Sequence, residues 1–231
     1  MLEVSGIDCF YGKVQVLRGL DLVARPGEVT CLMGRNGAGK STTLKAIMGL
    51  QPISTGAISL GSERLDTLPA HEVPKRGIGY VPQGRRLFAE MSVAENIEIG
   101  LMTRGRGEAV REKVLDLFPR LRERLSQRAG TMSGGEQQML AMARALCVEP
   151  TVLLLDEPTE GLQPSMISLI RDVVVRLKSM QVAIILVEQR VEAVLALADR
   201  VAFVENGHSR EVVAVSDLTP QSDILRKYVG V

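Results

Sequence analysis

The residues with the clearest chemical potential form a short glycine-rich stretch that ends in lysine and serine. It fits the pattern G-x-x-x-x-G-K-[ST] at every fixed position. Its glycines let successive backbone N–H groups converge on phosphate oxygens, and the start of the following helix adds positive potential. The lysine would reach the outer phosphates, and the serine hydroxyl would bind Mg²⁺. The pattern therefore predicts a nucleoside triphosphate site at Gly34-Arg35-Asn36-Gly37-Ala38-Gly39-Lys40-Ser41-Thr42.

Two adjacent carboxylates, Asp156 and Glu157, follow the apolar run Val152–Leu155. Parallel sheets present their ligands at the carboxyl ends of the strands. At such a place Asp156 would hold the Mg²⁺ shell, while Glu157 would polarise an attacking water molecule. An isolated pair of acids at a strand end is commonly only solvated. The complete phosphate loop in the same chain favours the functional interpretation.

A second candidate anion site is the segment Ser133-Gly134-Gly135-Glu136, which precedes an apolar helical run. Ser133 and Glu136 have the S-x-x-E spacing of a capping box, and this structural explanation is a good one. A capping box does not require two glycines inside it, however. Bare backbone N–H groups at a helix N-terminus bind anions. Because one chain needs only one triphosphate site, the segment suggests a site that is completed across a dimer.

The surrounding pattern predicts an α/β fold with a mostly parallel sheet. Residues 1–26 alternate as in antiparallel strands with a turn at Tyr11-Gly12-Lys13, and residues 51–70 resemble further edge strands and turns. Apolar strands separated by helices indicate a parallel sheet covered on both faces. The predicted strands are 28–33, 78–81, 152–155, 182–187 and 201–204, and the predicted helices beside them are 42–50, 165–179 and 190–198.

Residues 84–150 differ in sequence pattern from the rest of the chain. They have helical periodicity and charged faces at 94–102, 108–118 and 136–148. We therefore expect one domain over residues 1–231. Its core would comprise residues 1–83 and 151–231, including an N-terminal antiparallel β subdomain, and residues of about 84–150 would form a helical subdomain. We expect no regulatory domain after the last core strand.

The composition restricts the partners. The net charge is +1, only 3% of the residues are aromatic and there is no Trp, which argues against nucleic acid as a partner. The three cysteines have no metal-type spacing, so reduced thiols in a cytosolic setting are expected. No signal pattern is visible, and no apolar run approaches the roughly 18 residues needed to span a bilayer. Any work at a membrane would therefore require a partner.

Taken together, these motifs resemble the nucleotide-binding subunit of an ATP-binding cassette (ABC) transporter, over essentially the whole chain. The resemblance implies a P-loop NTPase core, with ATP and Mg²⁺ as ligands. It places the signature motif, which contacts the γ-phosphate held by the opposite subunit, on Ser133–Glu136. It also implies that Gln83 contacts Mg²⁺, that Glu157 is the catalytic carboxylate and that Tyr11 stacks on adenine.

The chain departs from the usual family pattern in four places. The signature begins with Met132 instead of leucine and has Glu136 in place of glutamine, and the loop Glu160–Gln163 lacks its final aspartate. Gln189 replaces the usual switch histidine. Glutamine can donate a hydrogen bond to the γ-phosphate but cannot take up a proton. Glu157 is then the only candidate base, with charge absorbed by Lys40, Mg²⁺ and Gln189.

The same departures resemble one subgroup of the family. The segments 187–189, 84–88 and 135–140 are similar to branched-chain amino acid importers, whereas 31–37 and 159–165 are similar to urea and short-chain amide importers. The subgroup implies two ATPase subunits, identical or sibling, that sandwich two ATP molecules. It also implies permease subunits gripped by the helical subdomain and the loop 83–88, a periplasmic solute-binding protein, and a peripheral location at the cytoplasmic face of a bacterial inner membrane.

Two other classes share part of the pattern. An ABC ATPase of DNA repair or translation would usually carry coiled coils, zinc insertions or two cassettes, and none is visible here. A small-molecule kinase would share Gly34–Ser41 but would leave Ser133–Glu136 unexplained. The sequence therefore favours an ATPase that powers solute import.

Overall fold

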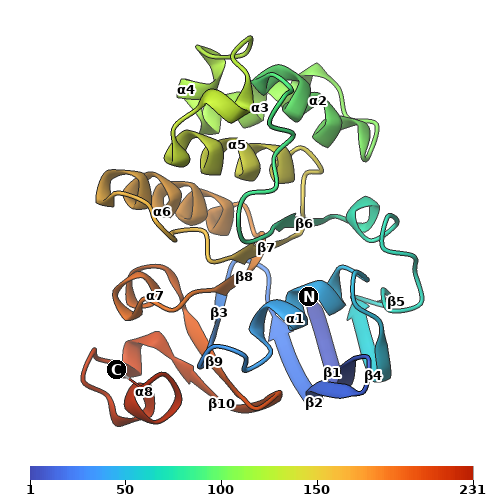
Figure 1. Cartoon of the computed structure of the whole chain (residues 1–231), viewed down its shortest axis with the longest axis vertical. Helices are drawn as coiled ribbons and strands as arrows, with labels where there is room; N and C mark the ends of the chain where they lie inside the picture. The colour runs from blue at the N-terminus through green and yellow to red at the C-terminus, as the bar shows by residue number, and fades with distance from the viewer. Residues whose placement is uncertain (231) are drawn as a thin grey trace.

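Two β-sheets and a separate group of helices make up the structure, a computed structural model that describes residues 1–230 (Figure 1). The N-terminal sheet has the strand order β2-β1-β4-β5, and its pairings are antiparallel. Its alternating pattern turns one face inward, since Val4 and Ile7 are buried while Ser5 is exposed. The expected turn after Tyr11 is confirmed. The strands are β1 (Leu2–Tyr11), β2 (Val14–Ala24), β4 (Ile53–Leu60) and β5 (Glu63–Arg64).

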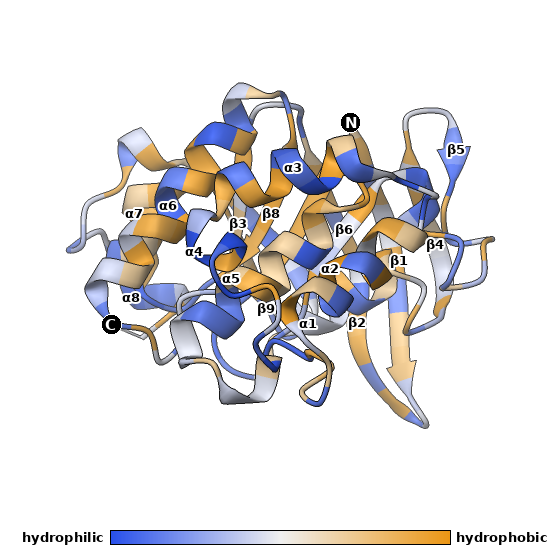
Figure 2. Ribbon diagram, turned by 90° about the horizontal axis from the view of Figure 1, so that it is seen from above, coloured by the Kyte–Doolittle hydropathy of each residue, from blue (hydrophilic) through white to orange (hydrophobic). Residues whose placement is uncertain are grey.

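The second sheet has the order β10-β9-β3-β8-β7-β6. All neighbours are parallel except β10, which runs antiparallel to β9. Strands β3, β7 and β8 are buried along their whole length and are mostly apolar, as the orange interior of Figure 2 indicates, with Thr30 and Asp156 as the buried polar exceptions. The predicted mostly parallel sheet is confirmed. The strands are β3 (Val29–Met33), β6 (Ile78–Val81), β7 (Val152–Asp156), β8 (Ala183–Val187), β9 (Arg200–Glu205) and β10 (His208–Ala214).

Helices and the N-terminal sheet cover the two faces of this parallel sheet. On one face, Leu154 and Ile185 pack into a core with α1 and the N-terminal sheet. On the other face, Leu153 and Ile184 pack into a core with α5, α6 and α7. Within residues 1–230, no helix combines the length and apolar character that crossing a membrane requires. The flanking helices are α1 (Lys40–Ile47), α6 (Pro164–Ser179) and α7 (Val191–Leu197).

Four helices lie together at the top of Figure 1, in green and yellow. They are α2 (Val93–Met102), α3 (Glu108–Leu117), α4 (Pro119–Arg122) and α5 (Gly134–Leu146). The helices predicted within residues 84–150 are confirmed, with small shifts at their ends. The α/β fold class is confirmed with them, whereas the domain boundaries near residues 84 and 150 stay predictions.

Several short elements were not predicted from the sequence. The sheet continues past the expected last strand into β10, and the chain ends in α8 (Asp223–Tyr228). Tertiary packing explains this helix, because the Tyr228 ring stacks on Phe203 at 5.0 Å between centroids and Leu225 is buried. The remaining short elements are the 3₁₀ helices Pro74–Arg76, Ala129–Thr131 and Val215–Asp217.

A buried asparagine attaches the loop after β6 to the helical group. Asn96 is fully buried, and its Oδ1 accepts from the backbone N–H of Phe88 at 3.1 Å. Its Nδ2 donates to the carbonyl oxygens of Phe88, Met91 and Ser92 at 3.1, 3.4 and 2.9 Å. Arg144 on α5 adds a bond to the Arg86 carbonyl at 2.7 Å. The loop that follows Gln83 is therefore attached to α2 and α5 by these hydrogen bonds.

Replacing Asn96 with alanine should lower the free energy of unfolding by about 2 kcal/mol, because buried backbone groups lose their partners. Urea denaturation followed by circular dichroism measures this change. Glu98→Ala is the matched control, since Glu98 is exposed on the same helix. Equal stability of the two variants would contradict a structural role for the asparagine network.

Candidate functional site

Segments from both sheets line a polar cleft of about 640 Å³. Most of its lining residues were singled out from the sequence, and the structure brings them together from β1, the phosphate loop, and the loops after β6, β7 and β8. Two lining residues, Val16 and Glu160, were not among the predicted site residues. The full lining is Tyr11, Val16, Asn36, Gly37, Gly39, Lys40, Ser41, Thr42, Gln83, Glu157, Glu160 and Gln189.

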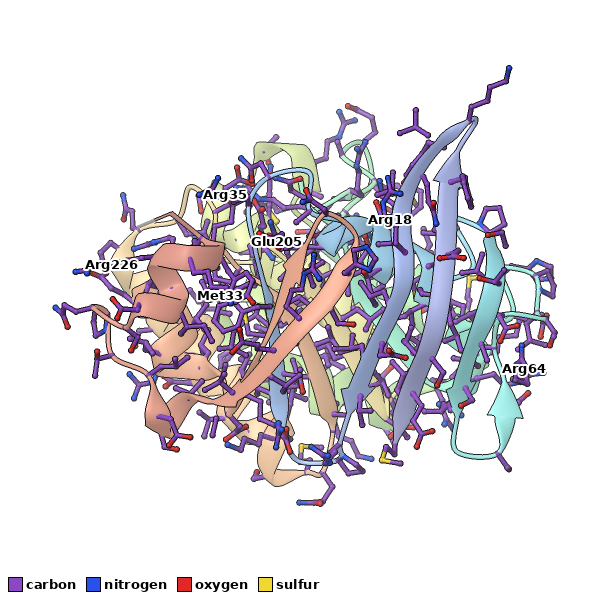
Figure 3. The ribbon with its side chains drawn as sticks, turned by 90° about the horizontal axis from the view of Figure 1, so that it is seen from below. Arg18, Met33, Arg35, Arg64, Glu205 and Arg226 are labelled. Carbon is purple, nitrogen blue, oxygen red and sulfur yellow. The ribbon has the colours of Figure 1, made fainter. Side chains whose placement is uncertain are left out.

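The glycines of the phosphate loop are required by close approach and by backbone conformation. A Cβ on Gly34 would lie 2.1 Å from the Val204 carbonyl oxygen, and Gly39 has φ +112° at the N-cap of α1. Gly37 differs, because φ is +79° but a Cβ there would meet nothing within 4 Å. This side of the loop is open, which fits a phosphate group. Ala38 is buried, and the exposed Arg35 side chain on the loop after β3 does not line the cleft (Figure 3).

Lys40 is buried at the centre of this loop, with 6% of its surface exposed. Its Nζ donates to the carbonyl oxygens of Gly34 at 2.7 Å and Arg35 at 3.0 Å. Burial lowers the pKa of Lys40, and the nearby Glu157 and Asp156 carboxylates act in the opposite direction. A phosphate would offer this ammonium group the negative charge that carbonyl oxygens supply only in part.

The predicted metal ligands supply the oxygen donors that Mg²⁺ prefers. The Ser41 hydroxyl donates to Asp156 Oδ1 at 3.0 Å, so two of the three predicted ligands already touch. Burial raises the pKa of Asp156, and the hydrogen bond from Ser41 opposes that change. Gln83 lies in the same cleft and would contribute its amide oxygen. The donor set of hydroxyl, carboxylate and amide therefore fits Mg²⁺.

Glu157 occupies a strained and closely held position. Its φ is +50°, in the left-handed region that non-glycine residues seldom adopt. Its backbone N–H donates to the Val187 carbonyl at 2.9 Å, which fixes the loop after β7 against the end of β8. One carboxylate oxygen accepts from Gln83 Nε2 at 3.0 Å, and the other accepts from Gln189 Nε2. Two amide side chains thus hold the carboxylate that the sequence singled out as a base.

Two further carboxylates at the site were missed by the sequence analysis. Glu160 Oε2 lies 3.0 Å from Gln83 Nε2, and its backbone N–H donates to the Glu157 carbonyl at 3.2 Å. Glu188 is buried and accepts from the Thr159 hydroxyl. It also accepts from the backbone N–H groups of Gln189 at 2.9 Å and Arg190 at 3.1 Å. For Glu160, its closeness to Glu157 in the sequence could have indicated a place in the site. For Glu188, no local sequence pattern indicated its role.

The Ser133–Glu136 segment forms the predicted capping box. Ser133 Oγ accepts from the Glu136 backbone N–H at 3.4 Å, and Glu136 Oε2 accepts from Ser133 N at 3.0 Å and Oγ at 2.7 Å. The bonds from Ser133 lower the pKa of Glu136. None of residues 133–136 lines the cleft described above, and α5 lies apart from α1 (Figure 1). The structural explanation is thus confirmed, and binding of a second anion stays a prediction.

Known proteins that resemble this chain come from one family. A family model described as "ABC transporter" matches residues 17–160. The chain is 44% identical to the "High-affinity branched-chain amino acid transport ATP-binding protein BraG" of Pseudomonas aeruginosa, covering 90% of each chain. It is 38% identical to the "Probable branched-chain amino acid transport ATP-binding protein LivF" of Archaeoglobus fulgidus, covering 92% of this chain and 94% of that protein.

A solved structure described as the "ATP binding subunit of ABC transporter" superposes with a TM-score of 0.83 at 30% identity. The superposition covers 98% of this chain and 92% of the other. The similarity thus extends across both sheets and the helical group, well beyond the phosphate loop.

Replacing Lys40 with methionine should weaken nucleoside triphosphate binding roughly 100-fold, because a buried ammonium partner for phosphate is lost. Titration with a fluorescent ATP analogue measures the dissociation constant. Lys45→Met is the matched control, since Lys45 is exposed on the same helix. Equal affinities of the two variants would contradict the assignment of Lys40 to phosphate.

Proposed function

The chain belongs to the ABC transporter family of ATP-binding proteins, and we propose that this ATPase drives solute import through a membrane permease. Similarity to the branched-chain amino acid transport proteins supports the import role. The observation that carries the ATPase activity is the placement of Glu157 between Gln83 and Gln189 beside the phosphate loop. It supports hydrolysis in addition to nucleotide binding, because a carboxylate and hydrogen-bond donors converge on one cleft.

ATP lies along the cleft, with its phosphates at the phosphate loop and its adenine at Tyr11. The phosphate loop residues Gly34–Thr42 hold the phosphates through backbone N–H groups and Lys40. Tyr11 offers its ring to the adenine, since it lies at the cleft with 43% of its surface exposed. Ser41, Asp156 and Gln83 would hold Mg²⁺, which would neutralise charge on the phosphates.

Hydrolysis depends on Glu157 as the general base. In the structure its two oxygens accept hydrogen bonds from the side-chain amides of Gln83 and Gln189. In the proposed reaction Gln189 turns from the carboxylate toward the phosphate oxygens while Gln83 stays in place, held by Glu160, and Glu157 is then free to polarise water. General-base catalysis of this kind contributes about 10²–10⁴ in rate. Gln189 stabilises charge as a donor and takes no proton.

A second ATPase subunit completes each site. The N-terminus of α5 at Ser133–Glu136 supplies N–H donors to the nucleotide held by its partner, and the partner does the same in return. The absence of these four residues from the lining of their own cleft supports this reciprocal arrangement. The partner is a second copy of the chain or a sibling ATPase.

The permease binds beside the helical group. A groove of about 320 Å³ lies among β6, α2 and α5, and its lining includes Arg86, Phe88 and Arg144. Phe88 is 47% exposed although it is large and apolar. Cytoplasmic helices of permease subunits fit this groove. The ATPase is then peripheral at the cytoplasmic face of the membrane, and a periplasmic solute-binding protein delivers the solute from the other side.

Similarity supports branched-chain amino acids as the solutes, since both relatives described above are named for that transport. Urea and short-chain amides are the second candidate class. The segments 31–37 and 159–165 favour it through their resemblance to importers of those compounds.

Replacing Glu157 with glutamine should preserve ATP binding and reduce turnover by about 10²–10⁴. The variant should also accumulate a dimer in ATP, because hydrolysis no longer separates the subunits. Phosphate release and size-exclusion chromatography measure these effects. The exposed Glu123→Gln is the control, and wild-type turnover by Glu157→Gln would overturn the assignment of the base.

Deletion of the gene should abolish uptake of labelled leucine and leave uptake of labelled urea unchanged. The wild-type gene should restore uptake, while the Glu157→Gln gene should not. Loss of urea uptake alone would transfer the assignment to urea and short-chain amides. Unchanged uptake of both compounds would contradict the solutes proposed here.

A further inference from the structure

We propose that Glu160 is a positioning residue that orients the Gln83 side-chain amide so that its oxygen is presented to Mg²⁺. The inference rests on the proposed function, because it concerns the same hydrolytic site. Glu160 lies in the loop after β7 and was not recognised as a functional residue from the sequence. It lines the cleft beside the residues that bind and hydrolyse the nucleotide.

The two carboxylates on one side of Gln83 determine which end of its amide faces them. Gln83 Nε2 is 3.0 Å from Glu157 Oε2 and 3.0 Å from Glu160 Oε2. A carboxylate accepts hydrogen bonds, and only the nitrogen end of an amide can donate two of them. The reverse orientation would place the amide oxygen against two carboxylates. Glu157 and Glu160 therefore hold the nitrogen end jointly.

The oxygen end of the same amide is free to bind a metal. Among residues 1–230, Gln83 Oε1 accepts no hydrogen bond, and the two carboxylates contact the nitrogen of the amide instead. Ser41 and Asp156 supply the other oxygen donors and are joined to each other at 3.0 Å. An amide fixed at its nitrogen presents its oxygen without further reorganisation, which favours metal binding.

Glu160 is needed because Glu157 has another task. When Glu157 polarises water, its oxygens are no longer available to hold Gln83. Glu160 takes no part in the proton transfer and can keep its bond to Nε2 throughout. Its backbone bond to Glu157 at 3.2 Å holds the two carboxylates in one turn. The second carboxylate therefore preserves the orientation of Gln83 during the reaction.

The loop beyond Gln83 connects the bond between Glu160 and Gln83 to the helical group. Arg85 Nη1 donates to Gln137 Oε1 on α5 at 3.1 Å, and Arg144 donates to the Arg86 carbonyl at 2.7 Å. These bonds attach the loop to the helical group, whereas Glu160 attaches Gln83 to the parallel sheet. Glu160 thus fixes the Gln83 side chain to the sheet separately from the bonds that fix its loop to the helical group.

The first test uses the nucleotide-free protein and NMR of ¹⁵N-labelled glutamine side chains. The Gln83 amide signal is identified by its loss in Gln83→Ala. In Glu160→Ala one amide proton should shift toward the free-amide position and exchange with water several-fold faster. Glu160→Gln should give an intermediate result, because its carbonyl can still accept. The exposed control Glu123→Ala should leave the Gln83 signal unchanged.

The second test measures the Mg²⁺ concentration for half-maximal ATPase activity. Glu160→Ala should raise it roughly tenfold, corresponding to one lost charge-assisted hydrogen bond, with a smaller change in the KM for ATP. In a Gln83→Ala background the same substitution should have no further effect, since the amide it orients is absent. A merely structural loss would add to the effect of Gln83→Ala.

An unchanged Gln83 signal in Glu160→Ala would overturn the inference, as would an additive effect on the Mg²⁺ requirement. These results are separable from failure of the proposed function. If wild-type protein showed no ATPase activity, the hydrolytic function would fail, while the NMR experiment would still decide whether Glu160 holds the Gln83 amide.

Discussion

The site depends on one backbone constraint, the side-by-side ending of two buried parallel strands. Asp156 pairs in register with Val187, and the Glu157 N–H donates to the Val187 carbonyl. This bond fixes the start of the loop that carries Glu157 next to the start of the loop that carries Gln189. Buried Glu188 strengthens the junction by accepting from Thr159 on one loop and from two N–H groups on the other. The strain at Glu157 persists because these contacts over-determine its position.

Charge balance at the cleft follows from that geometry. The carboxylates of Asp156 and Glu157 act on the buried ammonium group of Lys40. Glu160 adds a third carboxylate beside Gln83, and the amides of Gln83 and Gln189 supply further donors. Such a site suits the proposed binding of Mg²⁺ together with phosphate, because the metal would compensate the carboxylates while Lys40 would compensate the phosphates. In the proposed mechanism Gln189 is the donor that moves, so nucleotide binding would release Glu157 from one of its two amide partners.

The sequence predicted those features whose chemistry is encoded within a few residues. The phosphate loop needs glycines, lysine and serine at fixed spacing, and the apolar strand before Asp156 is recognisable alone. Glu160 and Glu188 could not be predicted in this way, because the partner of Glu160 is Gln83 in the loop after β6 and the partner of Glu188 is Thr159 in the loop after β7. Helix α8 was missed for a related reason, since its packing of Tyr228 on Phe203 is a tertiary contact. Long-range partners, rather than local propensity, account for these omissions.

The glycines of the signature segment show how one motif satisfies several constraints at once. A Cβ on Gly135 would lie 2.6 Å from Met166 Cε, and a Cβ on Gly134 would lie 3.0 Å from Arg85 Nη2. A side chain at either position would therefore displace the Met166 or the Arg85 side chain, so the two glycines fit the local packing even without a ligand. The carboxylate of Glu136 is neutralised locally, because Arg124 Nε lies 3.2 Å from its Oε1 while Ser133 binds its Oε2. With that charge compensated and the Arg85 guanidinium alongside, the N-terminus of α5 would suit the partner-subunit anion that the proposed dimer requires.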